Sequence, residues 1–361
     1  MTLGRTSREL VGLGTLLLTL LLGCVSATLA QHSPESPEKY YRQGVQALGN
    51  EQWNAAVTFF ESALKLDPRR AEAQNGLGVA LGKLGDEKRS VAAFRSAMLL
   101  DPTYAEPHYN LAQWLMQSGD TQQAISELNT AIKLRTDYRA AQFSLALLLQ
   151  DRGDTDQAIA PLRAVLQQDP RFAEGHNWLG VAYAQKTHFL DAIGQFQQAI
   201  DLNPEYLSAY NNLGSTLARA KKLDEAIRIF RKAIALVPQN VELRVNLSRL
   251  LRETGNLDGA LDELRSALKH GDDALVEGEI AELLRRKGDL AGAIAAAEKS
   301  LTLDNELGSA YQSLGLALRA ASAAQKHSPN HWASEEASRH FDTGRDLLSR
   351  GDVEGAKKEF E

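Results

Sequence analysis

The sequence has 361 residues, of which 43% are hydrophobic and 24% are charged, a composition that suits a folded soluble chain and excludes a polytopic membrane protein. Its single cysteine excludes a disulfide framework, a zinc site built from cysteines and an iron–sulfur cluster. Lysine and arginine number 40 against 46 aspartate and glutamate, so the net charge of −6 provides no bulk attraction for phosphate backbones. Nucleic acid is therefore not an expected partner.

The first thirty residues have the pattern of an export signal. Arg5 and Arg8 precede an apolar run at residues 10–22, and small residues follow it. That run is shorter than the roughly 20 residues that cross a bilayer as a helix, so a permanent membrane span is not expected. We expect residues 1–23 to be a signal peptide and residues 24–36 to be a linker, because residues 31–38 are rich in Ser, Pro and Glu.

The position of Cys24 distinguishes two kinds of signal. The segment Leu21-Leu22-Gly23-Cys24 resembles the lipobox of bacterial lipoproteins, in which the cysteine is lipidated and becomes the new N-terminus. In the alternative, an ordinary signal peptide is cut after Ala27 or Ala30. We favour lipidation of Cys24, because the only cysteine of the chain stands where such a signal needs it. The expected location is the periplasm, or the membrane surface through a lipid anchor.

The rest of the chain repeats with a period of 34 residues. Thr136 stands at the one vacant place of a grid formed by Pro68, Pro102, Pro170, Pro204 and Pro238. Proline at this place ends one helix pair and begins the next. A second grid consists of Gly85-Asp86, Gly119-Asp120, Gly153-Asp154, Gly255-Asn256, Gly288-Asp289 and Gly351-Asp352. Because such a glycine can close a helix and the Asp or Asn can cap the next one, each repeat is predicted to be helix, tight turn, helix.

Large and small residues recur at fixed places within each repeat. In the repeat at residues 207–240 the series is Tyr210, Leu213, Gly214, Leu217, Ala226, Phe230, Ala233 and Pro238. This series resembles the pattern of the tetratricopeptide repeat (TPR) family. The resemblance implies an all-α fold, a right-handed superhelical solenoid of antiparallel helix pairs whose first helices line the concave side, with small residues where the paired helices meet. It predicts eight repeats at residues 37–307, a degenerate repeat with a loop at 308–336, and an incomplete last repeat at 337–361.

One interval departs from the period. Only 33 residues separate Gly255 from Gly288, and the missing residue falls around residues 270–273, where the grid proline is also absent. We expect a bend or a loosened junction between repeats there.

No catalytic motif stands out. The sequence has no phosphate-binding loop, nucleophile elbow or His-Glu-x-x-His motif, so we expect neither an enzyme nor a cofactor. No metal site is expected either: a histidine and glutamate cluster toward the C-terminus is predicted to be a solvated loop. That cluster consists of His327, His331, Glu335, Glu336 and His340. His108 and His176 are expected to pack between helices.

The first-helix positions predicted to face the concave side form a groove rich in amides. They are Asn75, Tyr109, Asn110, Gln113, Phe143, Ser144, Asn177, Trp178, Asn211, Asn212, Ser215, Asn246 and Arg249. Their row of asparagines is similar to the asparagine ladder of O-linked N-acetylglucosamine transferases, which implies binding of an extended peptide backbone. In the alternative, these asparagines only stabilise helix starts and the repeat pattern. A clamp for chaperone tails is disfavoured, because its basic positions hold Ala140 and Ser144 in one window and Glu242 and Asn246 in the next.

Arginines follow this groove in the later repeats. The inward register there carries Arg249, Arg252, Arg285, Arg286 and Arg319, with Glu253, Glu279 and Glu282 among them. This band would hold acidic residues or a chain terminus of a bound segment. The alternative is ordinary ion pairing on a helix surface at three- and four-residue spacing.

The sequence thus predicts a non-catalytic interaction scaffold of the bacterial cell envelope, whose partner is a protein or an extended peptide. One alternative is the substrate-docking region of a longer enzyme such as a glycosyltransferase. The export signal argues against it, since nucleotide-sugar donors are cytosolic. A second alternative is an assembly factor for pili, secretins or outer-membrane proteins.

Overall fold

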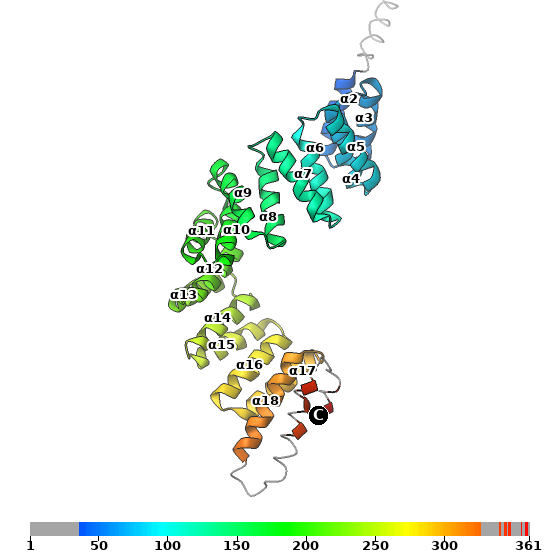
Figure 1. Ribbon diagram of the computed structural model, residues 1–361. Helices are drawn as coiled ribbons and strands as arrows, with labels where there is room; N and C mark the ends of the chain where they lie inside the picture. Colours follow the sequence, from blue (N-terminus) through cyan, green and yellow to red (C-terminus); the bar gives the residue numbers. More distant parts are fainter. Residues whose placement is uncertain are drawn as a thin grey trace, which may run out of the picture. The chain divides into compact units, whose positions relative to one another are not determined.

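The computed structural model describes residues 36–325 and, nearer the C-terminus, residues 339–340, 343–344, 346–347, 355 and 358–359. Within these ranges the chain is helical and has no strand, which confirms the predicted all-α fold of helix pairs (Figure 1). It divides between Arg152 and Gly153 into two compact units. The signal peptide, Cys24 and nearly all of the predicted linker lie outside the described residues.

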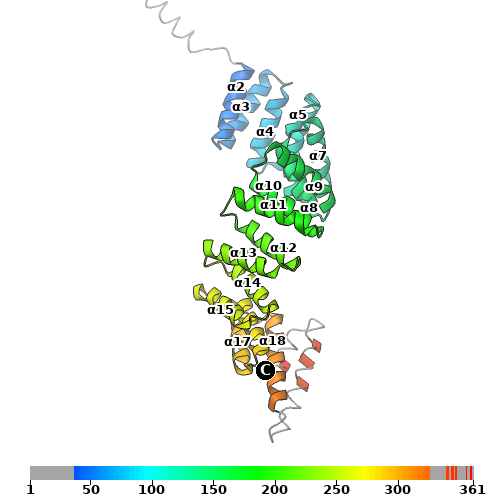
Figure 2. The same ribbon diagram turned by 90° about the vertical axis from the view of Figure 1, so that its left-hand side faces the viewer.

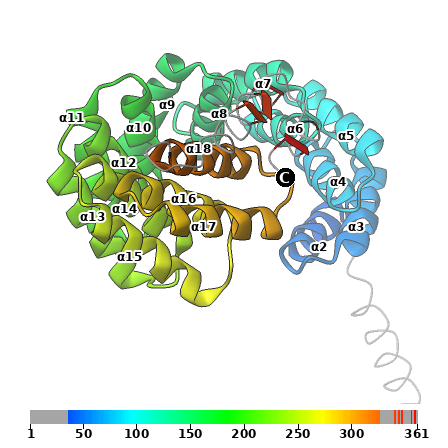
Figure 3. The ribbon, with the colours of Figure 1, turned by 90° about the horizontal axis from the view of Figure 1, so that it is seen from below.

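The helices of the first unit are α2 (Pro37–Gly49), α3 (Trp53–Leu66), α4 (Ala71–Lys83), α5 (Glu87–Leu100), α6 (Ala105–Gln117), α7 (Thr121–Leu134) and α8 (Arg139–Asp151). Those of the second unit are α9 (Thr155–Gln168), α10 (Ala173–Gln185), α11 (Phe189–Leu202), α12 (Leu207–Arg219), α13 (Leu223–Leu236), α14 (Val241–Glu253), α15 (Leu257–Ala267), α16 (Ala274–Lys287), α17 (Leu290–Leu303) and α18 (Gly308–Gln325). Within each unit, every helix packs against the next along the chain, as α12, α13 and α14 show in Figure 2 and α16, α17 and α18 in Figure 3.

Glycine closes the first helix of several repeats as predicted. Gly85, Gly119, Gly153, Gly255 and Gly288 all have φ between 80° and 88°, the left-handed region that glycine enters without a steric penalty. The side chains of Asp86, Asp120, Asn256 and Asp289 then cap the second helices by accepting hydrogen bonds from backbone N–H groups. Glu51, Thr187 and Lys221 occupy the same turn in the remaining regular repeats with φ of 56°, 60° and 62°, so the turn geometry is kept even where glycine is absent.

Thr187 offers a test of this turn. Its side chain is exposed and β-branched at positive φ, so Thr187→Gly is expected to raise the free energy of unfolding by about 1 kcal/mol. A Cβ atom at Gly255 has no neighbour within 4 Å, so the reciprocal change, Gly255→Thr, is expected to lower stability mainly through backbone strain. Urea denaturation of both variants measures the two effects, and equal stability of Thr187→Gly and wild type would show that the turn carries no strain.

The core depends on close approach of paired helices. Gly44, Gly78, Gly180 and Gly214 each face the phenylalanine sixteen residues later, and a Cβ atom there would lie 2.5–2.6 Å from a ring carbon of Phe60, Phe94, Phe196 or Phe230. Alanine and leucine replace this pair in the repeat of α6 and α7, where Ala112 and Leu128 are fully buried. The small residue and the large one therefore compensate each other in volume, which confirms the predicted role of small residues between paired helices.

A polar contact between the two helices of a pair recurs in every second pair, from α6 and α7 to α14 and α15. His108 Nδ1 lies 2.6 Å from Glu127 Oε2, His176 Nδ1 lies 2.8 Å from Gln195 Oε1, and Arg244 donates to Glu263 over 2.6 Å. Each contact spans 19 residues, so the predicted packing of His108 and His176 between helices is confirmed. His340 lies 2.7 Å from Glu359 at the same spacing.

The connection between α15 and α16 differs from the other connections between repeats, at the place where a bend or a loosened junction was expected. Helix α15 has 11 residues, where the other second helices have 14, and a short 3-10 helix at Leu268–His270 follows it. Asp273 caps α16 by accepting from the N–H groups of Leu275 and Val276. Lys299 of α17 donates to Asp272 over 2.8 Å and contacts the buried Glu277 of α16 at 2.7 Å, so an ion-pair network secures the altered connection.

Candidate functional site

Three asparagine pairs of the predicted groove are hydrogen-bonded from one repeat to the next. Asn110 Nδ2 donates to Asn75 Oδ1 over 2.9 Å in the first unit. In the second unit Asn212 donates to Asn177 over 2.9 Å, and Asn246 donates to Asn211 over 2.8 Å. Each bond joins the first helices of consecutive repeats and spans 35 residues. We call these three pairs the asparagine ladder.

Further polar groups extend the ladder. Asn75 donates to the Tyr104 hydroxyl over 3.3 Å, Asn211 donates to Glu242 over 3.0 Å, and Gln113 donates to Ser144 over 3.0 Å. Burial, assisted by the nearby charge of Glu106, raises the pKa of Tyr104 to about 12, so this phenol remains neutral at physiological pH. The three asparagine pairs and Tyr104 are therefore uncharged, and Glu242 adds a carboxylate to them.

The ladder has a structural role and also retains binding capacity. A primary amide has two N–H donors and two acceptor lone pairs, and Asn246 uses one donor in its bond to Asn211. Asn110, Asn212 and Asn246 are only half-buried, whereas Asn177 is buried. The asparagines therefore stabilise the contact between repeats, and their accessible edges can still bind a ligand.

The aromatic residues of the predicted groove are half-buried on first helices. Tyr109 of α6 contacts Tyr138, with ring centroids 5.1 Å apart. Phe143 lies on α8 in the first unit and Trp178 on α10 in the second. Each can offer an apolar surface together with the neighbouring polar groups of its own unit.

Four of the five predicted arginines form two ion-paired groups, and the fifth, Arg319, lies on α18 outside both. Glu279 binds Arg249 at 2.9 Å and Arg252 at 3.0 Å, which joins α14 to α16. Glu282 binds Arg285 at 2.8 Å and Arg286 at 2.7 Å within α16, at the three- and four-residue spacing of helix-surface pairs. Each carboxylate thus pairs with two guanidinium groups. The C-terminal halves of α14 and α16 therefore carry an excess of positive charge in these two groups.

The ion pairs of Glu282 with Arg285 and Arg286 also lower the pKa of this glutamate. Burial raises the pKa of Glu282, but the hydrogen bonds from Arg285 and Arg286 outweigh it and hold the pKa below its ordinary value. The stabilisation is therefore present at neutral pH and is lost only as the pH falls through that lowered pKa. The ion pairs of Glu282 with Arg285 and Arg286 consequently remain intact across the physiological range.

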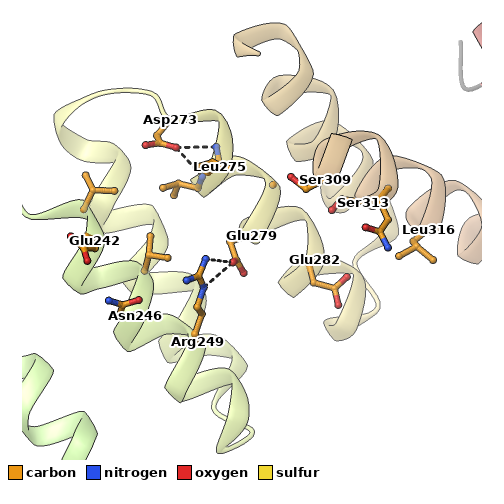
Figure 4. Close-up of a pocket in the computed structure, with 15 residues that line it drawn as sticks. Glu242, Asn246, Arg249, Asp273, Leu275, Glu279, Glu282, Ser309, Ser313 and Leu316 are labelled. Carbon is orange, nitrogen blue, oxygen red and sulfur yellow. Dashed lines mark hydrogen bonds and ion pairs between the residues drawn. The ribbon is translucent and has the colours of Figure 1, made fainter. Parts of the chain in front are cut away.

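Three pockets lie along the first helices. One of about 340 Å³ lies between α4 and α6 and includes Asn110 and Gln113 among its lining residues. A second of about 510 Å³ between α12 and α14 includes Ser215, Asn246, Arg249 and Arg286. The third and largest of these, about 750 Å³, lies among α14, α16 and α18 (Figure 4). Predicted groove residues thus line all three.

The third pocket includes residues that the sequence analysis did not select. Asn246 and Arg249 belong to the predicted groove, and Glu279 and Glu282 belong to the predicted arginine band, whereas the remaining residues come from α14, α16 with its N-cap, and α18. These remaining residues are Val241, Glu242, Val245, Asp273, Leu275, Val276, Gly278, Ser309, Gln312, Ser313 and Leu316. The signal that could have located them is the 33-residue interval, because it falls at the N-terminal end of α16.

No part of the described chain brings together three or more His, Cys, Asp or Glu residues in a group able to hold a metal ion. Of the histidine and glutamate cluster, His327, His331, Glu335 and Glu336 lie outside the described residues. The arrangement on the first helices offers hydrogen bonds, apolar contact and charge, which are the means of binding a polypeptide.

Two family models described as tetratricopeptide repeat match the sequence. One matches residues 41–105, 109–170, 143–186 and 179–241, and the other matches residues 217–285. The chain belongs to the tetratricopeptide repeat family. A search of curated proteins found no match.

Among solved structures, a TPR protein from Parabacteroides merdae is similar with 18% identity and a TM-score of 0.51, covering 68% of this chain and 98% of its own. YrrB, described as a TPR protein with an unusual peptide-binding site, is 24% identical with a TM-score of 0.43, covering 51% and 95%. MamA is 26% identical with a TM-score of 0.42, covering 47% and 93%. The first likeness supports the TPR fold.

Proposed function

We propose that this TPR protein is a non-catalytic interaction scaffold of the bacterial cell envelope that binds an extended peptide, or an extended segment of a partner protein, along its first helices. Membership of the TPR family supports a protein partner. Continuous right-handed stacking of the repeats, with the first helices on the concave side, is part of this proposal.

The asparagine ladder carries the proposal. An extended peptide presents an N–H and a C=O group at every residue, and an amide side chain can donate to one and accept from the other. Because Asn246 lies on a half-buried surface and lines two of the pockets, a bound backbone could reach it while neighbouring side chains enter those pockets. Such recognition is largely independent of the peptide's side chains.

Export and lipid anchoring are proposed on the sequence alone. Arg5, Arg8, the apolar run and Cys24 have the order of a lipoprotein signal. Within the described part of the chain, no helix is long and apolar enough to span a bilayer. A lipid on Cys24, followed by the linker, would hold the repeats at the membrane surface.

The groove is tested with Asn246→Ala. Dodecapeptides selected from a random phage library on the full chain are expected to bind this variant about 5- to 30-fold more weakly than wild type, the loss of one or two hydrogen bonds. Fluorescence anisotropy with labelled peptides measures the change, and circular dichroism checks the fold. Gln198→Ala, which removes an exposed amide from the second helix α11, is the matched control. Failure to recover any peptide, or equal weakening by both variants, would contradict the proposed groove.

A further inference from the structure

The pocket among α14, α16 and α18 lies where the repeat period is broken. Its lining includes Asp273, Leu275 and Val276, which directly follow the shortened helix α15 and the 3-10 helix at Leu268–His270. Asn246 and Arg249 make the pocket continuous with the predicted groove. Its volume of about 750 Å³ lies within the range of sites that enclose a ligand.

Five of the fifteen residues that line the pocket are aliphatic. Val241 and Val245 come from α14, Leu275 and Val276 from α16, and Leu316 from α18. Leu275 is 62% exposed, and it is one of the residues that line the pocket (Figure 4). An apolar group that covers Leu275 would remove the leucine's surface from water. This hydrophobic burial is the main favourable term in most protein association.

Charge is unevenly distributed along the pocket. Glu242 accepts a hydrogen bond from the Asn211 amide, and Asp273 accepts from backbone N–H groups, so neither of these contacts neutralises the carboxylate. Glu279 and Glu282, in contrast, are each paired with two arginines. Negative charge therefore remains at the end formed by Glu242 and Asp273.

The opposite end is positive. Arg249 lies seven residues after Glu242 on α14, a separation of about 10 Å along the helix axis. Acidic residues at helix N-termini and arginines at C-termini also compensate helix dipoles, which accounts for the charges in a protein without a ligand. Dipole compensation explains the charges at the two ends of the pocket. It does not explain why an exposed leucine, Leu275, lines the pocket between them.

We propose that this pocket takes an aliphatic or aromatic side chain of the bound segment and that a neighbouring lysine or arginine of the same segment lies against Glu242 and Asp273. This inference rests on the proposed function and specifies which peptides the groove prefers. An acidic residue farther along the segment would then face the arginines around Arg249, which sets the direction of binding.

The test uses the same random dodecapeptides selected on the full chain. Recovered sequences are expected to be enriched in an apolar residue close to Lys or Arg. Replacing that apolar residue by Ser, or that basic residue by Glu, is expected to weaken binding at least tenfold in fluorescence anisotropy. Added salt should reduce the effect of the basic residue and leave the effect of the apolar residue largely unchanged.

Two matched pairs of variants locate the effect. Leu275→Gln should abolish the preference for the apolar residue, whereas Leu190→Gln should not, because Leu190 is an equally placed exposed leucine in the first turn of α11. Glu242→Gln should reduce the tenfold preference for Lys over Glu to less than threefold. Glu174→Gln is its control, since Glu174 occupies the same place in α10, two repeats earlier.

The outcomes separate this inference from the function on which it rests. Peptides that lose affinity on Asn246→Ala but bind Leu275→Gln and Glu242→Gln like wild type would support the groove and overturn the proposed preference. Loss with Leu275→Gln and Glu242→Gln, but not with their controls, would support both. Equal loss with a variant and its control would also overturn the preference, because it would indicate a general effect on the fold.

Discussion

Replacing Gly214 with leucine is expected to lower the free energy of unfolding by roughly 3 kcal/mol, the upper range of overpacking effects. A Cβ atom at Gly214 would lie 2.5 Å from Cε2 of Phe230, and the remaining atoms of leucine would add to this overlap. Phe230 is itself almost fully buried, so its ring cannot turn into solvent to make room. Helices α12 and α13 would have to separate.

The damage should remain local. In an array whose stability is the sum of repeats and nearest-neighbour interfaces, loss of one helix pair weakens its neighbours most. Amide hydrogens of α12 and α13 in the Gly214→Leu variant should therefore exchange faster, while those of α16 and α17 stay protected. Hydrogen exchange followed by mass spectrometry measures protection peptide by peptide.

Gly194→Ala is the control for this experiment. Gly194 also lies within a helix, α11, but a Cβ atom there has no neighbour within 4 Å. Alanine should stabilise the helix by about 0.5–1 kcal/mol, because glycine loses more backbone entropy on folding. Changes of opposite sign in the free energy of unfolding of Gly214→Leu and Gly194→Ala would confirm that the steric environment of each glycine decides the effect. Uniform loss of protection along the whole of the second unit in Gly214→Leu would contradict the nearest-neighbour description.

The helix pairs could be predicted because their causes are local and periodic. Each glycine and its phenylalanine partner are sixteen residues apart, as Gly214 and Phe230 show, and the family resemblance assigns both a place in the repeat. The turn glycines are equally visible in the sequence. At Thr187 and Lys221 the same turn forms without glycine, since the packing of the flanking helices compensates for an unfavourable φ.

The interactions on the groove surface were harder to predict. Selecting Asn177 and Asn212 as groove residues required only their place in the repeat, whereas their mutual bond depends on how one repeat is placed against the next. The same holds for Arg249 and Glu279, which are 30 residues apart. Arg285 and Arg286, in contrast, pair with Glu282 at the spacing that the sequence analysis had given as an alternative.

The large pocket illustrates a third limit. The irregular interval around residues 270–273 was visible in the sequence, and the structure shows a shortened α15 and a 3-10 helix there. Its effect on the neighbouring first helices could not be derived from periodicity, because a periodic pattern describes only the regular repeats. Leu275 and Glu242 share a pocket because of the relative positions of α14, α16 and α18, which no repeat pattern specifies.

The largest effect expected outside the repeats concerns Cys24. If the lipobox interpretation is correct, Cys24 carries the lipid, and each CH₂ group buried in a bilayer contributes about 0.8 kcal/mol of membrane affinity. Because one acyl chain gives only reversible binding, stable anchoring requires at least two signals, such as two chains on the same residue. Loss of the cysteine removes them together.

In bacterial cells that express the full chain, wild type is therefore expected to incorporate labelled palmitate and to sediment with membranes. Cys24→Ser should abolish incorporation of the label, and any matured chain should be released as a soluble protein. Ser26→Ala, two residues away, should keep both properties, because it leaves the cysteine and the preceding Gly23 intact. N-terminal sequencing of the mature wild type distinguishes cleavage before Cys24 from cleavage after Ala27 or Ala30. Recovery of unlabelled, soluble wild type that begins after either alanine would contradict the proposed anchor and would leave export by an ordinary signal peptide.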